Sequence, residues 1–369
     1  MATNCTCPDT APGLPSSIES PVNDSRQSAL KSVAGAILIP LLAVCLMAGY
    51  PIDARSVEAS HATPMDATDG ATISVVRLQL TAKAFAPEQI KVAIYLPPGY
   101  ERAVAAGRRY PVLYANDGQD MPAVGLQSTL AQLYRDTAIE PVIVVAIDML
   151  ADRASAYGLS DRATSRSIVG GSRIGPIGTR AQDYSAWVAT QLVPYIDTHY
   201  RTRRSARERT ILGWSLGALN AFNLAWQYPD VFGRVGAFSP SFWLASDRSN
   251  ADTIQKSRLA QGIVNRSSKR AGLKLWFSVG TAEETSDRNG DGVIDAIEDV
   301  QELIEGYRAA DGFQARGLQQ LGYSVDPDYA QDPSRHADVV LLLLKDGQHN
   351  QASWKKMLPP FLLWAYRRD

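Results

Sequence analysis

A serine in the middle of the chain has the neighbours that a catalytic nucleophile requires. The segment Thr210–Leu219 reads TILGWSLGAL, which is a short apolar strand, a Gly-x-Ser-x-Gly motif and the start of a helical pattern. At such a turn the serine backbone is strained, and side chains at Gly213 and Gly217 would collide with the neighbouring strand and helix. The pattern predicts that Ser215 presents its hydroxyl clear of a sheet. The alternative is a serine that only caps a helix in a tight turn.

A serine hydroxyl needs a general base, and the sequence offers His61, His199, His336 and His349. In the α/β-hydrolase fold, which this turn indicates, the chain order is nucleophile, acid, histidine, so the two histidines before the serine are excluded. The other two stand before and after an apolar strand expected at Val339–Leu344. Only the loop after that strand leads back over the serine. We therefore predict His349 as the base and His336 as a surface residue.

Two adjacent carboxylates follow the strand expected before it, Leu273–Val279, in the sequence Gly-Thr-Ala-Glu-Glu. A carboxylate at this strand end can accept a hydrogen bond from His349 Nδ1 and fix the tautomer of the imidazole. We favour Glu283 over Glu284 as this acid, and the chain order excludes neither. The alternative is a solvated acidic turn.

Two backbone N–H groups are candidates for an oxyanion hole. The first is that of Leu216, because the helix that starts there directs its N-terminal N–H groups at the developing charge. The second should come from the loop after the strand Pro111–Ala115, which continues Asn-Asp-Gly-Gln. Gly118 permits close approach of a substrate, so we predict the N–H of Gln119. An ordinary Asp-Gly turn is the alternative.

The elements that must position these residues alternate between strand and helix. This alternation predicts a largely parallel sheet with helices on both faces, in one α/β-hydrolase domain over residues 73–369. Strands are expected at Ile73–Leu80, Ile90–Leu96, Pro111–Ala115, Pro141–Ile147, Thr210–Gly213, Val235–Phe238, Leu273–Val279 and Val339–Leu344, and helices at Leu126–Arg135, Ala181–His199, Leu216–Gln227, Ala296–Ala309 and Gln351–Arg367.

Several longer blocks resemble the putative-esterase family, which groups enterochelin esterases, feruloyl esterases, formylglutathione hydrolases and the antigen-85 mycolyltransferases. The resemblance spans residues 89–366. It implies that Ser215 is the nucleophile, His349 the base and Glu283 the acid, at a position where several members have Asp. The blocks are VAIYLPPGYE (Val92–Glu101), YPVLYANDGQ (Tyr110–Gln119), LVPYIDTHYRT (Leu192–Thr202), ILGWSLGALNAFNLAWQYPDVFGRVGAFSPSFW (Ile211–Trp243), SVGTAEE (Ser278–Glu284) and GQHNQASWKKMLPPFLLW (Gly347–Trp364).

The segment after the two glutamates fits the twelve-residue calcium loop of an EF-hand. Residues 287–298 read DRNGDGVIDAIE and match D-x-[DN]-x-[DN]-G-x₅-E at every specified position. Because a strand rather than a helix enters, we predict a single EF-like loop with a structural calcium ion and no cofactor for catalysis. An acidic turn without metal is the alternative. The candidate ligands are Asp287, Asn289, Asp291, the Val293 carbonyl, Asp295 through water and bidentate Glu298.

A stretch rich in Gly, Ser and Arg, Asp152–Arg180, is long for a connection and lacks periodicity. Such loops often form lids or substrate walls. Its arginines suit an anionic or hydroxylated acyl group, and a solvated basic loop is an equal alternative. The arginines are Arg153, Arg162, Arg166, Arg173 and Arg180, against Asp152 and Asp161 within the stretch.

Composition excludes some functions. Lys+Arg 37 against Asp+Glu 38 argues against a nucleic-acid-binding protein, which would show a basic excess. The three cysteines, Cys5, Cys7 and Cys45, all lie in the first fifty residues, so the body of the chain has no disulfide framework or thiol nucleophile.

The N-terminal part predicts export. Residues 1–54 combine a polar lead with an uncharged apolar run, Val33–Gly49, and residues 55–72 form a polar linker. The run is between a secretory signal and a membrane span in length, and Pro40 at its centre favours the signal. We expect a periplasmic, secreted or outer-side anchored protein. Cleavage, lipid attachment and retention as a membrane anchor stay open, and a buried cytoplasmic helix is the alternative.

Together these observations predict a serine carboxylic-ester hydrolase that acts on a small-molecule ester through an acyl-enzyme. One alternative is an acyltransferase of the mycolyltransferase type, with the same residues and an alcohol acceptor. Another is a calcium-stabilised binding module with a dead site, against which the intact order of serine, acid and histidine speaks. The sequence does not identify the ester.

Overall fold

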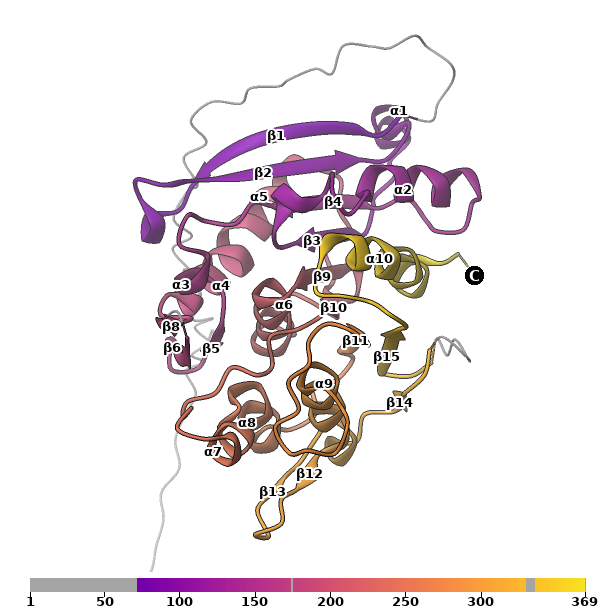
Figure 1. Cartoon of the computed structure of the whole chain (residues 1–369). Coiled ribbons are helices and arrows are strands. Elements are labelled where there is room, and N and C mark those ends of the chain that lie inside the picture. The colour runs from indigo at the N-terminus through magenta and orange to yellow at the C-terminus, as the bar shows by residue number, and fades with distance from the viewer. Residues whose placement is uncertain (1–71, 174, 330–335, 369) are drawn as a thin grey trace, which may run out of the picture. The chain divides into compact units, whose positions relative to one another are not determined.

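The computed structural model describes residues 72–173, 175–329 and 336–368, and Figure 1 labels the strands and helices of this unit. A central sheet with nine strands among these residues organises the unit. β2 is antiparallel to its two neighbours β1 and β4, and every neighbouring pair from β4 to β14 is parallel, which confirms the predicted largely parallel sheet. In spatial order the strands are β1 (Ser74–Thr81), β2 (Gln89–Leu96), β4 (Ile143–Ile147), β3 (Val112–Ala115), β9 (Arg209–Trp214), β10 (Arg234–Phe238), β11 (Lys274–Gly280), β15 (Val339–Leu344) and β14 (Val325–Asp326).

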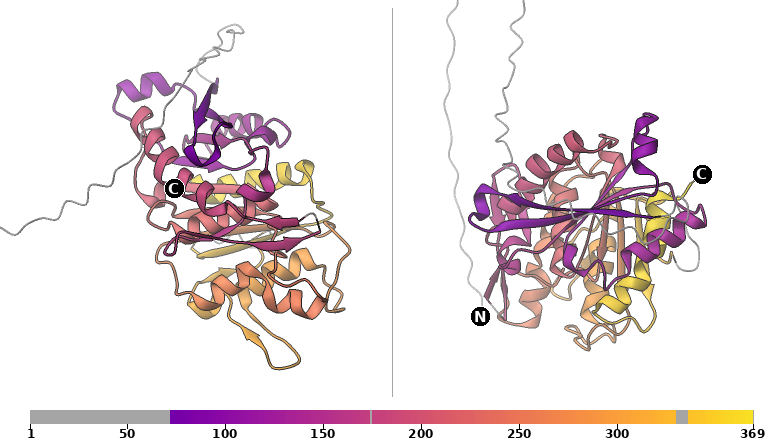
Figure 2. Two further views of the ribbon diagram at one scale, coloured as in Figure 1. Left: turned by 90° about the vertical axis from the view of Figure 1, so that its left-hand side faces the viewer. Right: turned by 90° about the horizontal axis from the view of Figure 1, so that it is seen from above.

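Helices cover both faces of this sheet, which confirms the predicted α/β architecture (Figure 2). α6 packs against β9 and β10 on one face, and α10 packs against β10, β11 and β15 on the other. The α-helices are α1 (Tyr100–Ala105), α2 (Leu126–Arg135), α3 (Arg153–Ala156), α4 (Ala181–Trp187), α5 (Val193–His199), α6 (Leu216–Gln227), α7 (Ala251–Ser257), α8 (Leu259–Arg266), α9 (Asp295–Glu305) and α10 (Gln351–Tyr366).

The central strands are buried on both faces because successive side chains point to opposite sides of a sheet. In β9, Ile211 belongs to the core under α6, whereas Leu212 belongs to the core under α10. In β11, Leu275 and Phe277 contribute to the first core and Trp276 to the second. A continuous apolar run without alternation is therefore what these parallel strands require.

The predicted helices and strands are present in the structure, with small shifts of their ends. The helix expected at Ala181–His199 consists of α4, a π-helical turn at Val188–Leu192 and α5. The helix expected at Ala296–Ala309 ends four residues early, because Gly306 takes a left-handed φ of 75° and closes α9. The sequence patterns did not predict α1, α3, α7, α8 or β14. They also did not predict three two-stranded pairs, which are β5 (Leu159–Asp161) with β6 (Arg166–Ile168), β7 (Gly170–Ser172) with β8 (Gly175–Ile177), and β12 (Tyr307–Arg308) with β13 (Gln314–Ala315).

The predicted N-terminal lead with its apolar run, residues 1–54, and all but the last residue of the linker 55–72 lie outside the described residues. Export and membrane anchoring therefore stay predictions. Within the described ranges, no helix combines the length and the apolar character that a membrane span needs.

The parallel strands bring distant segments to one edge of the sheet. The register pairs Trp214 at the end of β9 with Phe238 at the end of β10, and Phe238 with Ser278 in β11. Gly280 at the end of β11 pairs with Leu344 at the end of β15. The loops that follow β9, β10, β11 and β15 therefore leave the sheet at the same edge, next to one another.

Candidate active site

Ser215 occupies a strained turn between β9 and α6. Its φ of 57° and ψ of −127° are rarely adopted by residues with a side chain, and such strain costs about 1–3 kcal/mol. Hydrogen bonds hold it there, from Ser215 N–H to the Phe238 carbonyl (3.0 Å) and from the Ala218 N–H to the Ser215 carbonyl (3.1 Å). Ser215 lines a cavity next to Leu216, the first residue of α6.

The two motif glycines are required by close backbone approach. A Cβ at Gly213 would lie 2.2 Å from the Gly217 carbonyl oxygen, so β9 and the first turn of α6 could not pack as they do. A Cβ at Gly217 would lie 2.2 Å from Oδ2 of Asp117, in the loop after β3. The collision at Gly217 is thus with this loop rather than with a strand.

His349 and Glu283 meet at the same sheet edge, although 65 residues separate them. Glu283 Oε2 lies 2.9 Å from His349 Nδ1, so Nε2 takes no part in this contact. The Glu283 side chain is only 3% exposed, whereas His349 is 41% exposed. Their approach depends on Gly280, where a Cβ would lie 2.2 Å from the Gly347 carbonyl oxygen. A carboxylate in this position favours the imidazole tautomer that carries its proton on Nδ1.

The other oxygen of Glu283 is also held, by groups that the sequence analysis missed. Ser239 Oγ donates to Glu283 Oε1 (2.5 Å), and the Gly280 N–H donates to the same oxygen (2.7 Å). The indole N–H of Trp354, in α10, donates in turn to Ser239 Oγ (2.9 Å). Ser239 follows β10 directly with a left-handed φ of 47°. Its only sequence signal is this place, at the end of a strand beside the serine.

The structure separates Glu283 from its neighbour. The Glu284 side chain turns toward the start of α9, where burial raises its pKa and the negative charge of Asp295 raises it further. Of the two glutamates, it is therefore Glu283 that contacts the histidine.

The other described histidines lie elsewhere. His336 is exposed, before β15 and hence at the far end of that strand, as predicted. His199 ends α5, stacks on Tyr195 and hydrogen-bonds the Tyr195 carbonyl through Nδ1 (2.8 Å). His61 lies outside the described residues.

A buried ion pair supports the turn between β9 and α6 that contains Ser215. Asp117 is 1% exposed and accepts two hydrogen bonds from Arg153, at 2.8 and 2.9 Å. Arg153 also donates to the Trp214 carbonyl (3.3 Å), one residue before Ser215. Burial raises the pKa of Asp117, and the Arg153 guanidinium opposes that rise. The pair ties the loop after β3 to the end of β9.

The arginines of the stretch Asp152–Arg180 are less free than its own charge balance indicated. Besides Arg153, Arg162 is ion-paired with Asp230 and Arg180 with Asp183. These partners lie outside the stretch or at its edge, so a count of charges within it was misleading. The stretch forms α3 and the small pairs β5–β6 and β7–β8, and its residues Ser172, Arg173 and Ile177 line the cavity with Ser215. The expectation of a substrate wall fits this position.

Ser215 and His349 open onto one cavity of about 750 Å³. No hydrogen bond joins these two residues in the described part of the structure, and in unliganded enzymes this contact often tightens only when substrate binds. On the cavity wall, the Arg248 guanidinium lies 5.5 Å from the centre of the Trp243 ring. Its Nη1 is buried and has no hydrogen-bond partner among the described residues. This wall can therefore receive a planar or anionic group of a ligand.

The two predicted oxyanion donors are placed differently. Leu216 lines the cavity beside Ser215, at the N-terminus of α6. Gln119 lies in a short 3₁₀ turn, Gly118–Asp120, and lines separate cavities at β2 and β4. Its side-chain Oε1 accepts a hydrogen bond from the Met149 N–H (3.0 Å). The role of the Gln119 backbone N–H stays a prediction.

The predicted calcium loop, residues 287–298, connects β11 to α9 at the rim of this cavity. Asp287 and Asp295 line the cavity, as does Arg288. The loop thus lies beside the residues around Ser215 and His349, and its oxygens are those that could hold a metal ion near the site.

The sequence matches a family model described as "Putative esterase" over residues 84–365. A curated relative is an endo-1,4-beta-xylanase/feruloyl esterase of Xylanibacter ruminicola, 27% identical over 217 residues, a match that covers 52% of this chain and 26% of that protein.

Solved structures share the fold at lower identity. A ferulic acid esterase superposes with a TM-score of 0.54 and 18% identity, and the match covers 80% of this chain and 99% of that one. The enterochelin esterase of Shigella flexneri gives a TM-score of 0.53 and 15% identity, with 79% of this chain and 58% of that one covered. The chain thus spans only a little over half the length of the enterochelin esterase.

Proposed function

Because this chain belongs to the putative esterase family and is a carboxylic ester hydrolase, we propose that it works through an acyl-enzyme on Ser215 with His349 and Glu283. The observation that carries the proposal is the convergence on one cavity of a serine in a strained turn and a histidine held by a buried carboxylate. A serine is activated by such a base, and the third group keeps the base in the reactive tautomer.

In the first half-reaction Ser215 Oγ attacks the ester carbonyl while His349 Nε2 takes its proton. The carbonyl oxygen becomes an oxyanion, stabilised by the Leu216 N–H at the start of α6 and by the Gln119 N–H. Glu283 stays ionised and stabilises the imidazolium through Nδ1–H. When the tetrahedral intermediate collapses, the bond to the alkoxy oxygen breaks, and His349 protonates the leaving alcohol.

In the second half-reaction water takes the place of the alcohol. His349 Nε2 removes a proton from water as the water oxygen attacks the acyl carbon. The bond to Ser215 Oγ then breaks, His349 returns the proton to Ser215, and the free acid leaves. If an alcohol entered instead of water, the same residues would perform acyl transfer.

The cavity also indicates what kind of ester fits. Arg248 over Trp243 offers a flat aromatic surface next to an unpaired N–H donor, so we propose a substrate with an aryl or anionic group on one side of the ester. The names of the structural neighbours include a ferulic acid esterase and an enterochelin esterase. A panel of p-nitrophenyl, feruloyl and catechol-siderophore esters, together with matched alkyl esters, tests this class.

The mechanism is tested by two substitutions and one label. Ser215→Ala and His349→Ala should each lower kcat by roughly 10⁴- to 10⁶-fold with little change in melting temperature, since the residues act as a unit. A fluorophosphonate should label the parent on Ser215 and leave Ser215→Ala unlabelled, as seen by peptide mass spectrometry. Turnover that survives in either variant would refute the acyl-enzyme. Comparison of product ratios with and without a sugar or alcohol acceptor separates hydrolysis from acyl transfer.

A further inference from the structure

The backbone of residues 287–298 already has the form of a cation-binding loop. The Asp287 carboxylate, at the first position, accepts hydrogen bonds from the N–H groups of Gly290 (2.8 Å), Asp291 (3.2 Å) and Gly292 (2.9 Å). Gly292, at the sixth position, has a φ of 90° that lets the chain turn sharply. α9 leaves the loop at its end, as a helix does in an EF-hand. This folding alone fits an acidic turn as well as a metal site, so a second observation is needed.

That observation is Glu298, at the twelfth position. The residue is 6% exposed, and its Oε1 accepts a hydrogen bond from the Asn289 amide at the third position, so the carboxylate points into the loop. Its Oε2 is buried and has no hydrogen-bond partner among the described residues. The nearest cationic atom is Arg288 Nη2, 3.8 Å away. A buried carboxylate oxygen without a hydrogen bond is costly, and a bound cation would satisfy it.

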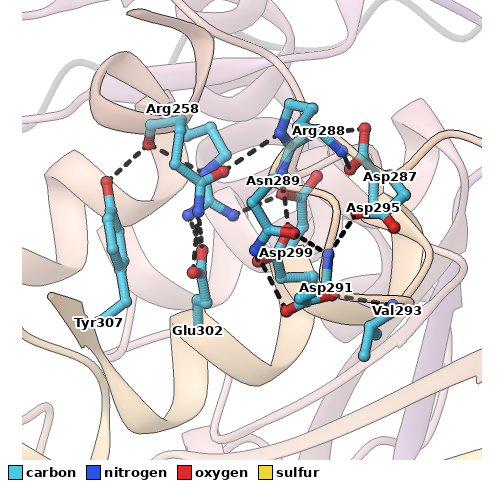
Figure 3. A network of polar contacts seen from close by, with 12 residues as sticks. Arg258, Asp287, Arg288, Asn289, Asp291, Val293, Asp295, Asp299, Glu302 and Tyr307 are labelled. Carbon is cyan, nitrogen blue, oxygen red and sulfur yellow. Dashed lines mark hydrogen bonds and ion pairs between the residues drawn. The ribbon is translucent and has the colours of Figure 1, made fainter. Parts of the chain in front are cut away.

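Carboxylates outnumber cationic groups around Glu298, which also favours binding of a cation; several of these side chains are labelled in Figure 3. Arg258 is ion-paired with Asp299 and Glu302, and Arg288 with Asp295 and Asp299. These two guanidinium groups are the cations that contact the cluster within the described residues. The carboxylates that they face or adjoin are Asp287, Asp291, Asp295, Glu298, Asp299 and Glu302. One divalent cation would reduce this excess of negative charge.

We propose that residues 287–298 bind one calcium ion that fixes the wall of the ester cavity. Within the described ranges, no three His, Cys, Asp or Glu side chains are gathered to hold a metal ion, because Arg288 and the Asn289 amide lie between the carboxylates. Binding requires Glu298 to exchange the Asn289 amide for the ion and Asn289 to present its oxygen instead. The ligands are Asp287, Asn289, Asp291, the Val293 carbonyl and both oxygens of Glu298, with Asp295 through water.

The ion would act on the ester cavity because the loop forms part of its wall. Asp287, Arg288 and Asp295 line the same cavity as Ser215 and His349. Calcium at this loop would order the wall and release Arg288 from Glu298 without entering the ester chemistry. This kinetic consequence rests on the proposed function, whereas binding of the ion does not.

Binding is tested with calcium alone on the full chain after treatment with EDTA. Single loops of this kind bind with a Kd of about 0.1–1 mM, so 10 mM calcium should raise the unfolding midpoint by roughly 3–8 °C. Glu298→Gln should abolish that rise and the heat of calcium titration. Asp291→Ala removes an exposed ligand, is expected to fold, and should abolish them too. Asp252→Asn, which removes an exposed carboxylate on α7, is the matched control and should keep both.

Two results would overturn the site. An unchanged midpoint together with no calorimetric binding would show that Arg288 alone neutralises the loop. An equal rise in Glu298→Gln and in the parent would place the ion elsewhere. For the link to the cavity, calcium should raise kcat/KM of the parent several-fold, mainly through KM, and leave Glu298→Gln unchanged. Calcium that binds without any change in KM would refute the link and leave the metal site standing.

Discussion

Ser239 should control the rate of ester hydrolysis although it touches no substrate, because it holds the buried carboxylate that orients the base. Ser239→Ala removes the hydrogen bond to Glu283 Oε1 and, among the described residues, leaves the Gly280 N–H as the one donor to that oxygen. A hydrogen bond to a charged group is worth about 1.5–3 kcal/mol. Since 1.36 kcal/mol is tenfold in rate, kcat should fall roughly 10- to 160-fold.

The double-mutant cycle with Glu283→Ala distinguishes this role from simple packing. Without the carboxylate, Ser239 has nothing to orient, so adding Ser239→Ala to Glu283→Ala should change kcat less than twofold. Steady-state kinetics of the four proteins on one p-nitrophenyl ester provide the cycle. If Ser239→Ala costs as much in the Glu283→Ala background as in the parent, then Ser239 acts independently of the acid and the argument fails.

A variant of Trp354 separates the effect of Ser239 on stability from its effect on activity. Ser239→Ala leaves the buried indole N–H of Trp354 without its acceptor, at a cost of about 1–3 kcal/mol to the folded state. Trp354→Phe removes that donor and keeps the bond from Ser239 to Glu283. This variant should therefore lose melting temperature, through the smaller ring, while it keeps more activity than Ser239→Ala.

Two further predictions follow from the placement of side chains around the cavity. Glu283→Gln should lower kcat at least 100-fold and Glu284→Gln less than tenfold, because of these two glutamates only Glu283 contacts His349. The reverse order in steady-state assays would assign the role of the acid to Glu284. Arg248→Gln should raise KM about tenfold for esters with a carboxylate or catechol and leave KM of a matched neutral alkyl ester within twofold; an equal change for both would remove Arg248 from substrate recognition.

Local sequence was enough to predict the turn at Ser215 and the sheet. The Gly-x-Ser-x-Gly motif predicts this turn for a structural reason, because a Cβ at Gly213 or Gly217 would collide with neighbouring atoms. Chain order then selected the histidine and the pair of glutamates. The choice between Glu283 and Glu284 needed the structure. The side chains of two neighbouring residues after a strand point in different directions, and the sequence does not show which of them points toward the histidine.

Long-range polar partners were beyond local sequence. Ser239 and Trp354 are 115 residues apart, and neither belongs to a motif with chemistry of its own. The pairing of Arg153 with Asp117 was missed for the same reason, since charges were balanced within a stretch rather than across the fold. A search for polar residues directly after each parallel strand would have found Ser239, because it follows β10 as the nucleophile follows β9.

The backbone contacts between the ends of β11 and β15 determine where the chain can change in length without moving Glu283 and His349. Besides the close approach of Gly280 to Gly347, the Thr281 N–H donates to the Leu344 carbonyl (3.0 Å) and the Ala282 N–H to that of Gly347 (2.8 Å). Glu283 and His349 are thus positioned by the few residues on either side of these contacts. The loop 285–292 after Glu284 is largely exposed, whereas α9 and β14 beyond it contribute to the core and to the central sheet. We therefore expect changes in length to be tolerated in this exposed loop, where they leave Glu283 and His349 in register, and not in the rest of the segment up to β15.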